Sequence, residues 1–139
     1  MRIAKKQGFT LLEIIIVIII VGVLASLALP RFFSTVEFSK STEALAGMGT
    51  LRQSMERCFT ASNSTYSGCT IASLDVDTPA NSPGNHFTYL ISAQSTTGFT
   101  IVATRNTYDG ATADGNTITL IQAATGVTRS GIGAYAGIK

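Results

Sequence analysis

The stretch that decides the fold is Lys5-Lys6-Gln7-Gly8-Phe9-Thr10-Leu11-Leu12-Glu13, which opens an apolar run extending to residue 29. Glu13 is the one carboxylate in that run. An ionisable side chain in a membrane span costs about 3 kcal/mol on insertion scales, so it needs a partner. Cleavage after Gly8 would make the α-amine of Phe9 a cation beside it. We therefore interpret the basic leader, the Gly8–Phe9 bond and Glu13 together, as a cleavage site whose product supplies the charge that partners Glu13.

The same residues resemble the class III leader and N-terminal helix of type IV pilins and type II secretion pseudopilins. The resemblance covers about residues 1–60. It implies that a prepilin peptidase removes residues 1–8 after Gly8, and that Phe9 is then N-methylated. It further implies that Phe9 and Glu13 act in filament assembly, and that the helix becomes the filament core in a helical homopolymer.

Residues 9–29 are long enough to cross a membrane. Their 21 residues would span about 32 Å as a helix. Arg2, Lys5 and Lys6 place the N-terminus in the cytoplasm by the positive-inside rule. We expect a single-pass precursor in a bacterial inner membrane, and a filament at the cell surface after assembly. An ordinary signal peptide cut near residues 25–28, or a plain anchor, is the alternative, but neither explains Glu13.

Gly22 and Pro30 bracket the end of this segment. Glycine weakens a helix by about 1 kcal/mol relative to alanine, and an interior proline costs about 3 kcal/mol. We expect residues 22–30 to loosen when a subunit leaves the bilayer. The alternative is simple tolerance, because membrane helices accept both residues.

Residues 30–59 change from uniformly apolar to amphipathic. Apolar side chains recur at steps of three and four residues, at Ala44, Leu45, Met48, Leu51, Met55, Cys58 and Phe59. This stripe predicts a helix that packs against a sheet, and Gly47 and Gly49 suggest a gentle bend. Phe32, Phe33 and Phe38 precede the stripe, and we interpret them as contacts between subunits rather than an electron-transport chain.

Residues 60–139 have the composition and patterning expected of a small β-sheet domain, which we call the head. Residues 87–91, 99–104 and 117–121 alternate apolar with polar side chains, and glycine-rich segments separate them. Val127 suggests a fourth short strand. We therefore predict an α+β, pilin-like fold in which a long N-terminal helix packs on three or four antiparallel strands. Residues 130–137 read as a surface tail, docked by Ile132 and Tyr135.

The chain has two cysteines, Cys58 and Cys69. In a translocated head an even cysteine count predicts a disulfide, which would pin residues 59–68 onto the end of the helix. A loop of this size stabilises by about 2.5–3 kcal/mol on the chain-entropy model. The loop holds Asn63-Ser64-Thr65, a formal glycosylation sequon that also occurs often by chance.

Charge and composition exclude several classes of function. The net charge is +2, but three of the ten cations lie in the leader. Arg52, Arg57, Arg105 and Arg129 look scattered along the sequence, so we expect no nucleic-acid partner. His86 is the single histidine, which rules out a metal triad or a Ser-His pair. We expect no enzyme and no cofactor.

The carboxylates of the head could suggest calcium, which needs six to eight oxygen ligands. The pairs Asp75 and Asp77, and Asp109 and Asp114 with Asn116, do not have the spacing of a ligand loop. We therefore interpret them as turn residues and expect no metal site.

The leading hypothesis is thus a structural subunit of a type IV pilus-like filament. Its alternatives are a pseudopilin of a type II secretion system, which would be periplasmic, and a minor pilin acting as an adhesin or a DNA-binding tip subunit. Residues 1–8 are the expected leader, 9–29 the membrane and filament-core helix, 30–59 its amphipathic half and 60–139 the head.

Overall fold

The computed structural model describes residues 8–79, 84–107 and 115–139. One helix, α1 (Leu11–Ala61), is followed by a 3-10 turn, η1 (Ile71–Ser73). Four strands come next: β1 (Phe87–Ser92), β2 (Phe99–Arg105), β3 (Thr117–Ala123) and β4 (Gly126–Gly131). Another 3-10 turn, η3 (Gly133–Tyr135), lies near the C-terminus. The α+β class and the long N-terminal helix are confirmed.

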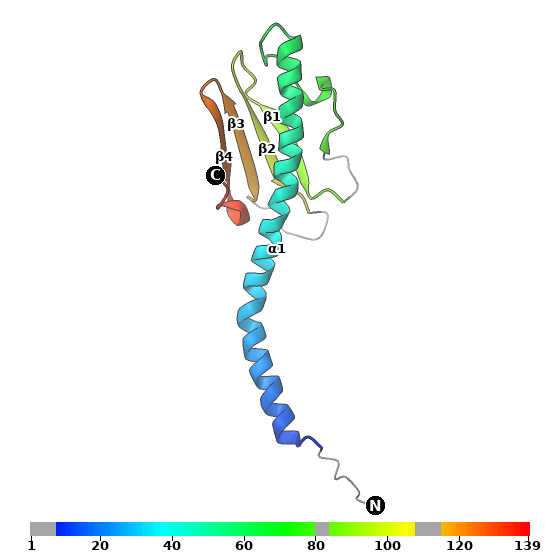
Figure 1. Ribbon diagram of the computed structural model, residues 1–139, viewed down its shortest axis with the longest axis vertical. Coiled ribbons are helices and arrows are strands. Elements are labelled where there is room, and N and C mark those ends of the chain that lie inside the picture. Colours follow the sequence, from blue (N-terminus) through cyan, green and yellow to red (C-terminus); the bar gives the residue numbers. More distant parts are fainter. Residues whose placement is uncertain (1–7, 80–83, 108–114) are drawn as a thin grey trace, which may run out of the picture. The chain divides into compact units, whose positions relative to one another are not determined.

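The chain divides into two compact units at Val36. The first contains the N-terminal part of α1, an apolar helix with almost every side chain exposed. The second, Glu37–Lys139, is the head, and the rest of α1 belongs to it. Within the head, this part of α1 lies across the sheet (Figure 1).

The sheet is an antiparallel meander in the order β1-β2-β3-β4. The strands that the sequence predicted are all present, and β4 makes the number four. Inward side chains alternate with outward ones, as expected for a sheet with one covered face. The inward positions of β1 and β2 hold Phe87, Tyr89, Ile91, Phe99, Ile101, Ala103 and Arg105.

The predicted stripe of α1 is the helix half of the core. Ala44, Met48, Leu51 and Met55 are fully buried. Leu45, Cys58 and Phe59 are partly buried and pack against the same cluster. Burying a large apolar side chain stabilises by about 1.5–3 kcal/mol, so this stripe anchors the helix to the sheet.

Gly47 has a different role from the bend that its sequence suggested. A Cβ at this position would overlap the hydroxyl and ring of Tyr89, so glycine lets α1 approach β1 closely. A Cβ on Gly49 would meet nothing within 4 Å. The two glycines therefore differ, although they are two residues apart.

The expected surface tail is wrong in part. Ser130 and Gly131 belong to β4, and Tyr135 is completely buried, with its ring centroid 5.6 Å from that of Phe87. Ile138 is 9% exposed, whereas Ile132 is 60% exposed and does not dock the tail. The tail is anchored by two side chains, Tyr135 and Ile138, and not by a periodic stripe. The sequence of small residues around them therefore gives no pattern that predicts a buried segment.

The outward face of the sheet carries no charged side chain among its described residues. The register places Leu90, Val102, Thr119 and Ser130 in one row across the strands. The neighbouring rows are Thr88, Thr104 and Thr117 on one side, and Ser92, Thr100, Ile121 and Thr128 on the other. This face therefore offers hydroxyl and methyl groups only.

Candidate functional site

The N-terminal segment begins with a capped helix. The Glu13 N–H donates to Thr10 Oγ1 at 3.3 Å, and the Ile14 N–H donates to the Thr10 carbonyl at the same distance. Thr10 is thus the N-cap and Glu13 lies in the first turn. A carboxylate there interacts favourably with the helix dipole. This capping pattern was present in the sequence and was missed.

Phe9 lies outside the helix, because α1 begins at Leu11. Phe9 and Glu13 are four residues apart, a spacing that would place both on one face of a helix, but in this structure of the uncleaved chain Phe9 is not helical. Gly8 and Phe9 are exposed, as a cleavage site must be. The basic residues of the leader, Arg2, Lys5 and Lys6, lie outside the described residues.

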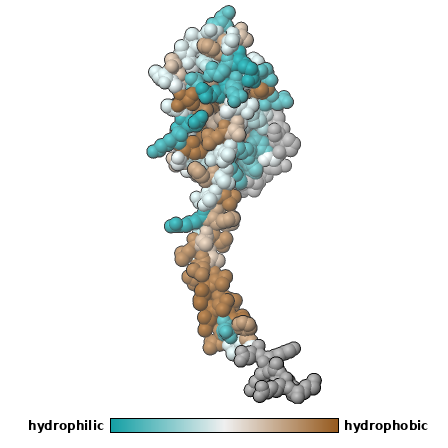
Figure 2. All heavy atoms as spheres, in the orientation of Figure 1, coloured by the Kyte–Doolittle hydropathy of each residue, from teal (hydrophilic) through white to brown (hydrophobic). Residues whose placement is uncertain are grey.

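The surface of the first unit is mostly apolar. Figure 2 shows this part of the helix largely in brown, interrupted by a few teal and pale residues. Side chains from Ile14 to Leu29 are largely exposed, for example Leu27 at 70% and Leu24 at 62%. Within the described residues, α1 is the one helix long and apolar enough to cross a membrane.

The helix continues through both of its predicted weak points. Gly22 and Pro30 lie inside α1, and nothing lies within 4 Å of a Cβ placed on Gly22. Pro30 has no N–H, so the Ser26 carbonyl lacks its usual helical donor. The loosening of residues 22–30 stays a prediction.

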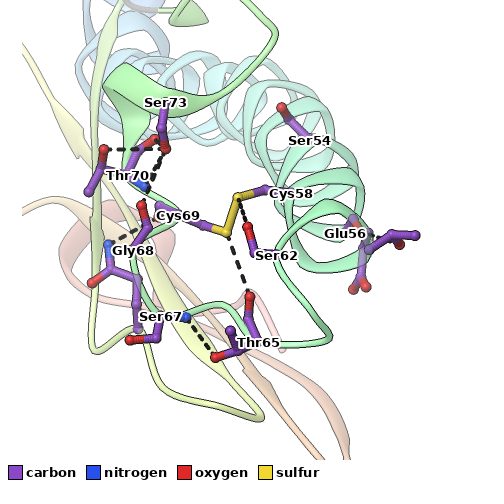
Figure 3. The surroundings of a disulfide bond; sticks show 12 residues. Ser54, Glu56, Cys58, Ser62, Thr65, Ser67, Gly68, Cys69, Thr70 and Ser73 are labelled. Carbon is purple, nitrogen blue, oxygen red and sulfur yellow. Dashed lines mark hydrogen bonds between the residues drawn. A yellow bond between two sulfur atoms is a disulfide. The ribbon is translucent and has the colours of Figure 1, made fainter.

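The Cys58–Cys69 disulfide is confirmed (Figure 3). The bond joins the last turn of α1 to the segment before η1, with the two Cα atoms 6.1 Å apart. Within the closed loop, Asn63 and Ser64 both have positive φ, of 54° and 60°. Both side chains are exposed, so the sequon is accessible, and its glycosylation stays a prediction.

Tyr66 fixes this loop to the head. Its ring centroid lies 4.5 Å from that of Phe59 and 4.8 Å from that of Phe99. Its hydroxyl donates to Glu56 Oε2 at 2.9 Å. Burial, followed by that hydrogen bond, raises the pKa of Tyr66 to about 12. The tyrosine therefore stays a donor across the physiological range.

A buried ion cluster lies where α1 enters the head. Arg105 Nε donates to Glu37 Oε1 at 2.6 Å, and the Tyr135 hydroxyl donates to the same oxygen at 2.7 Å. Lys40 Nζ lies 3.1 Å from Glu37 Oε2. Burial alone would raise the pKa of Glu37, but the hydrogen bonds from Arg105, Tyr135 and Lys40 lower it to about 2. Glu37 is thus ionised at neutral pH.

Two further carboxylates, those of Glu43 and Asp75, are engaged in hydrogen bonds within the head. Glu43 accepts from the His86 N–H at 2.7 Å, and its other oxygen lies 2.8 Å from His86 Nδ1. Asp75 accepts from Arg57 and Ser54, and these bonds hold the pKa of Asp75 below its usual range. No metal-binding group of three His, Cys, Asp or Glu occurs among the described residues, and Asp109 and Asp114 lie outside them.

Two of the four arginines that look scattered in the sequence, Arg52 and Arg129, come together in space. Arg105 and Arg57 are used in ion pairs. Arg52, Arg129 and Lys139 line one groove between α1 and the β4 side of the sheet. In the described part of the chain, none of these three forms an ion pair. Sequence separation of 87 residues between Arg52 and Lys139 hid this arrangement.

The groove is open and has a volume of about 530 Å³. Leu45, Leu120 and Ile138 supply apolar lining, while Gln53 and Glu56 add polar groups from α1. The position of Arg129 follows from the strand register. It pairs with Leu120, which faces the helix, so Arg129 also projects to the covered side. A basic groove with an apolar floor results.

Comparisons with known proteins agree with the fold. A family model described as "Type IV minor pilin ComP, DNA uptake sequence receptor" matches residues 30–119. A second, described as "Prokaryotic N-terminal methylation motif", matches residues 3–29. The first description names a DNA receptor, so the expectation of no nucleic-acid partner has no support from relatives.

Similar proteins match over 52 to 55 residues of the chain. The chain is 46% identical over 55 residues to a "Probable minor fimbrial protein" of Dichelobacter nodosus, covering 40% of this chain and 35% of that protein. It is 40% identical over 52 residues to "Type II secretion system core protein G" of Escherichia coli (strain K12), covering 37% and 36%. It is 36% identical over 55 residues to "Type IV major pilin protein PilA" of Myxococcus xanthus (strain DK1622), covering 40% and 25%.

The matched segment thus spans between a quarter and about a third of the length of these curated relatives. No solved structure matches. The family model, in contrast, extends from Pro30 through the rest of α1, β1 and β2 to Thr119 at the start of β3, which is well over half of the chain. On the strength of that match, joined to a methylation motif and a helix-on-meander fold, the chain belongs to the type IV minor pilin ComP family.

Proposed function

We propose that this protein is a minor subunit of a type IV pilus-like filament. The observation that carries the proposal is the exposed apolar surface of α1, which begins directly after a Gly8–Phe9 bond. More than 20 large apolar side chains are exposed in the single chain, most of them between Phe9 and Phe38. Surfaces of that extent need lipid or other subunits to cover them.

The maturation pathway follows from the N-terminal residues. A prepilin peptidase cuts after Gly8, Phe9 becomes the N-methylated terminus, and the subunit waits in the inner membrane with its head outside. Cleavage also frees Phe9 to extend the helix, because it removes the chain that precedes it. Mass spectrometry of the membrane form tests this step. A chain starting at methyl-Phe9 supports it, and one starting near Leu29 contradicts it.

Glu13 is proposed to recruit the next subunit. Its carboxylate pairs with the amine of Phe9 on a neighbouring chain, because a buried charge left without a partner costs several kcal/mol. The pairing would also set the axial register. Intramolecular shielding of its own terminus is the competing role. It predicts normal filaments from a Glu13→Ala variant, whereas recruitment predicts their loss.

The cleanest experiment compares Glu13→Ala and Glu13→Gln in cells without the wild-type subunit. Both variants should insert and be cleaved normally, which Phe9 methylation reports. Incorporation into sheared filaments should fall at least tenfold. Ile14→Ala is the matched control, since it changes an adjacent apolar position without touching charge. Normal incorporation of Glu13→Ala would end the assembly role.

A second candidate function is DNA binding by the head, which the family description favours. It is proposed for this chain from the match over residues 30–119. Titrating the full chain in detergent with random duplex DNA, followed by sequencing of the retained fraction, tests it. Selective binding that weakens steeply with salt is the expected signature. Absence of binding at low salt would count against this function and leave the filament role intact.

A pseudopilin role is less favoured. Protein G and the pilin PilA both match over a little more than 50 residues, so these matches do not separate a pseudopilin from a pilin. The family model that reaches into the head is that of a minor pilin.

A further inference from the structure

The sheet of the head has two edge strands, and their free edges differ. β1 and β4 are the outer strands of the meander, so each has one row of backbone groups that faces no neighbouring strand (Figure 1). Such a row is a template on which another extended chain can pair. The hydrogen bonds at the strand ends identify which residues form each row.

The free edge of β1 is capped by side chains of the same head. The His86 carbonyl accepts a bond from the residue that follows β2, so the alternating backbone turns Phe87 and Ile91 to the free edge. Asn85 Oδ1 accepts from the Phe87 N–H at 3.1 Å, and Asn85 Nδ2 donates to the Phe87 carbonyl at 2.8 Å. Gln94 Nε2 donates to the Ile91 carbonyl at 3.4 Å. This edge is therefore partly closed to a further strand.

The free edge of β4 has no comparable cap within the described residues. The Ile132 N–H donates to the Thr117 carbonyl at 2.9 Å, which fixes the alternation along β4. The backbone groups of every second residue then face β3, whereas those of Val127 and Arg129 face outward. In the part of the chain that the structure describes, no protein group bonds these outward N–H and C=O groups. The β4 edge is thus open for pairing.

The same two residues connect this edge to the basic groove. Arg129 pairs with the inward-facing Leu120, so its side chain lies on the covered side of the sheet and lines the groove with Arg52 and Lys139. Val127 lies two residues away, on the same side, and packs against the core. A strand paired with β4 therefore places every second side chain on the groove side, next to Val127 and Arg129.

The charges of the groove define what those side chains should be. Arg52, Arg129 and Lys139 form no ion pair with any residue that the structure describes, so an acidic side chain opposite Arg129 meets complementary charge. The apolar side chain of Val127 favours an apolar residue opposite it. The two positions are two residues apart in the added strand, which gives an alternating acidic and apolar pattern.

The edge selects a peptide over nucleic acid and over a second copy of itself. Its outward N–H groups alternate with carbonyl oxygens, which phosphates cannot satisfy because phosphates only accept hydrogen bonds here. An extended peptide supplies both donors and acceptors. Antiparallel pairing of two β4 edges would bring two Arg129 side chains onto one face, where like charges destabilise the pair.

We infer that the β4 edge binds an extended segment of a different protein as a fifth, antiparallel strand of the sheet. The segment carries an acidic side chain opposite Arg129 and an apolar one opposite Val127, with small polar residues between them. Antiparallel pairing is slightly more stable per residue than parallel pairing. The contact is one-to-one and does not repeat through copies of this chain, in keeping with a minor subunit. It goes beyond the proposed filament function and does not depend on the Phe9–Glu13 pair.

The probe is a fluorescently labelled peptide, Thr-Val-Thr-Glu-Thr-Val-Thr, titrated into the full chain in detergent micelles. Arg129→Glu should weaken binding about tenfold or more, because it reverses the charge that faces the glutamate of the peptide. A peptide with lysine in place of glutamate should prefer the Arg129→Glu variant. Thr128→Glu is the matched control, since Thr128 pairs with Ile121 on the outward face and should leave binding within about twofold.

N-methylation of the peptide separates backbone pairing from charge. In an antiparallel strand, the valine and glutamate residues opposite Val127 and Arg129 exchange backbone bonds with β4. Methylating their amides should abolish binding, whereas methylating the threonine amides, which face away from β4, should preserve it. Both methylated peptides keep the glutamate, so a purely electrostatic contact would not distinguish them.

Amide hydrogen exchange on the full chain locates the contact. Without peptide, the amides of Val127 and Arg129 should exchange fast, while those of Thr128 and Ser130, which face β3, exchange slowly. Saturating peptide should slow the first pair about tenfold or more. An Arg129 amide that is already protected in the free chain would overturn the inference, because the edge would then be paired.

The inference also fails if the peptide does not bind, if it binds wild type and Arg129→Glu equally, or if the two methylated peptides bind alike. A random DNA duplex that binds through Arg129 and displaces the peptide from an unprotected edge would assign the groove to nucleic acid instead. Thermal melting of the head verifies that the variants fold. Glu13→Ala tests the filament proposal without touching β4, so the two proposals fail separately.

Discussion

At the scale of single residues, the most constrained group is the Glu37 carboxylate. It holds Arg105, whose side chain is fully buried on an otherwise apolar strand face. A buried charge that loses its partner is strongly destabilising. The position of Arg105 follows from strand alternation after Phe99, Ile101 and Ala103, but its partner lies 68 residues earlier and carries no sequence signal.

We predict that Glu37→Gln lowers the free energy of unfolding of the head by ~2–4 kcal/mol, because the buried Arg105 then loses the carboxylate to which its Nε donates. Urea unfolding at pH 7, followed by circular dichroism, measures the loss. Glu56→Gln is the control, since its partner Tyr66 is neutral and it should cost less. Equal losses in the two variants would contradict the special role of Glu37.

The same carboxylate predicts acid sensitivity. Its pKa is lowered from 4.5 to about 2 in the folded chain. A lowered folded-state pKa means that the stabilisation is complete above the unfolded pKa and is lost as pH falls towards the folded one. Stability should therefore decline between pH 4.5 and 2. Melting temperatures measured across that window should fall less steeply in Glu37→Gln than in the wild type.

At the scale of elements, α1 and β1 meet through a glycine. Gly47→Ala is expected to destabilise the head by ~1–3 kcal/mol, since the new methyl group overlaps the Tyr89 ring and hydroxyl. Gly49→Ala is expected to stabilise it by up to ~1 kcal/mol, because open space surrounds that position and alanine favours helix. Thermal melts of the two variants should move in opposite directions, and shifts of one sign would refute the packing argument.

The disulfide acts on the loop after α1. Replacing both cysteines, in Cys58→Ser with Cys69→Ser, should cost ~2–3 kcal/mol, because the chain of residues 59–68 regains its freedom when unfolded. The aromatic contacts of Tyr66 remain in that variant, so the head should still fold. Denaturant unfolding under oxidising and reducing conditions would show this, with the double variant insensitive to the reductant.

The sequence alone could predict the helix and the strands, but not the contacts between side chains that are distant in the chain. The apolar run, the amphipathic stripe of α1 and the three alternating segments each have a period that follows from helix or strand geometry. The cysteine pair followed from an even count. The Glu37 cluster, the Gly47 approach and the basic groove join residues that are distant in the chain, and they have no period. The docking of Tyr135 was predicted, but Ile138 and not Ile132 is the second buried side chain of the tail.

At the scale of the whole molecule, the two units face different solvents. The first exposes a largely apolar surface, and the head has a core of its own. Heating should therefore melt the head with little effect on the helix of the first unit while micelles cover it. Hydrogen exchange by residue would report early exchange in the sheet and late exchange in residues 14–29. The reverse order would mean that the helix is not held by detergent or lipid.

The meander order of the strands affects how fast the head of a subunit folds. Each strand pairs only with its neighbours in the sequence, β1 with β2, β2 with β3 and β3 with β4. Short loops close early, so each hairpin forms within about 1–10 μs and the search for partners stays local. Oxidation of Cys58 and Cys69 takes seconds or longer. The waiting time of a newly exported head is thus set by thiol chemistry, and not by the search of its strands for their partners.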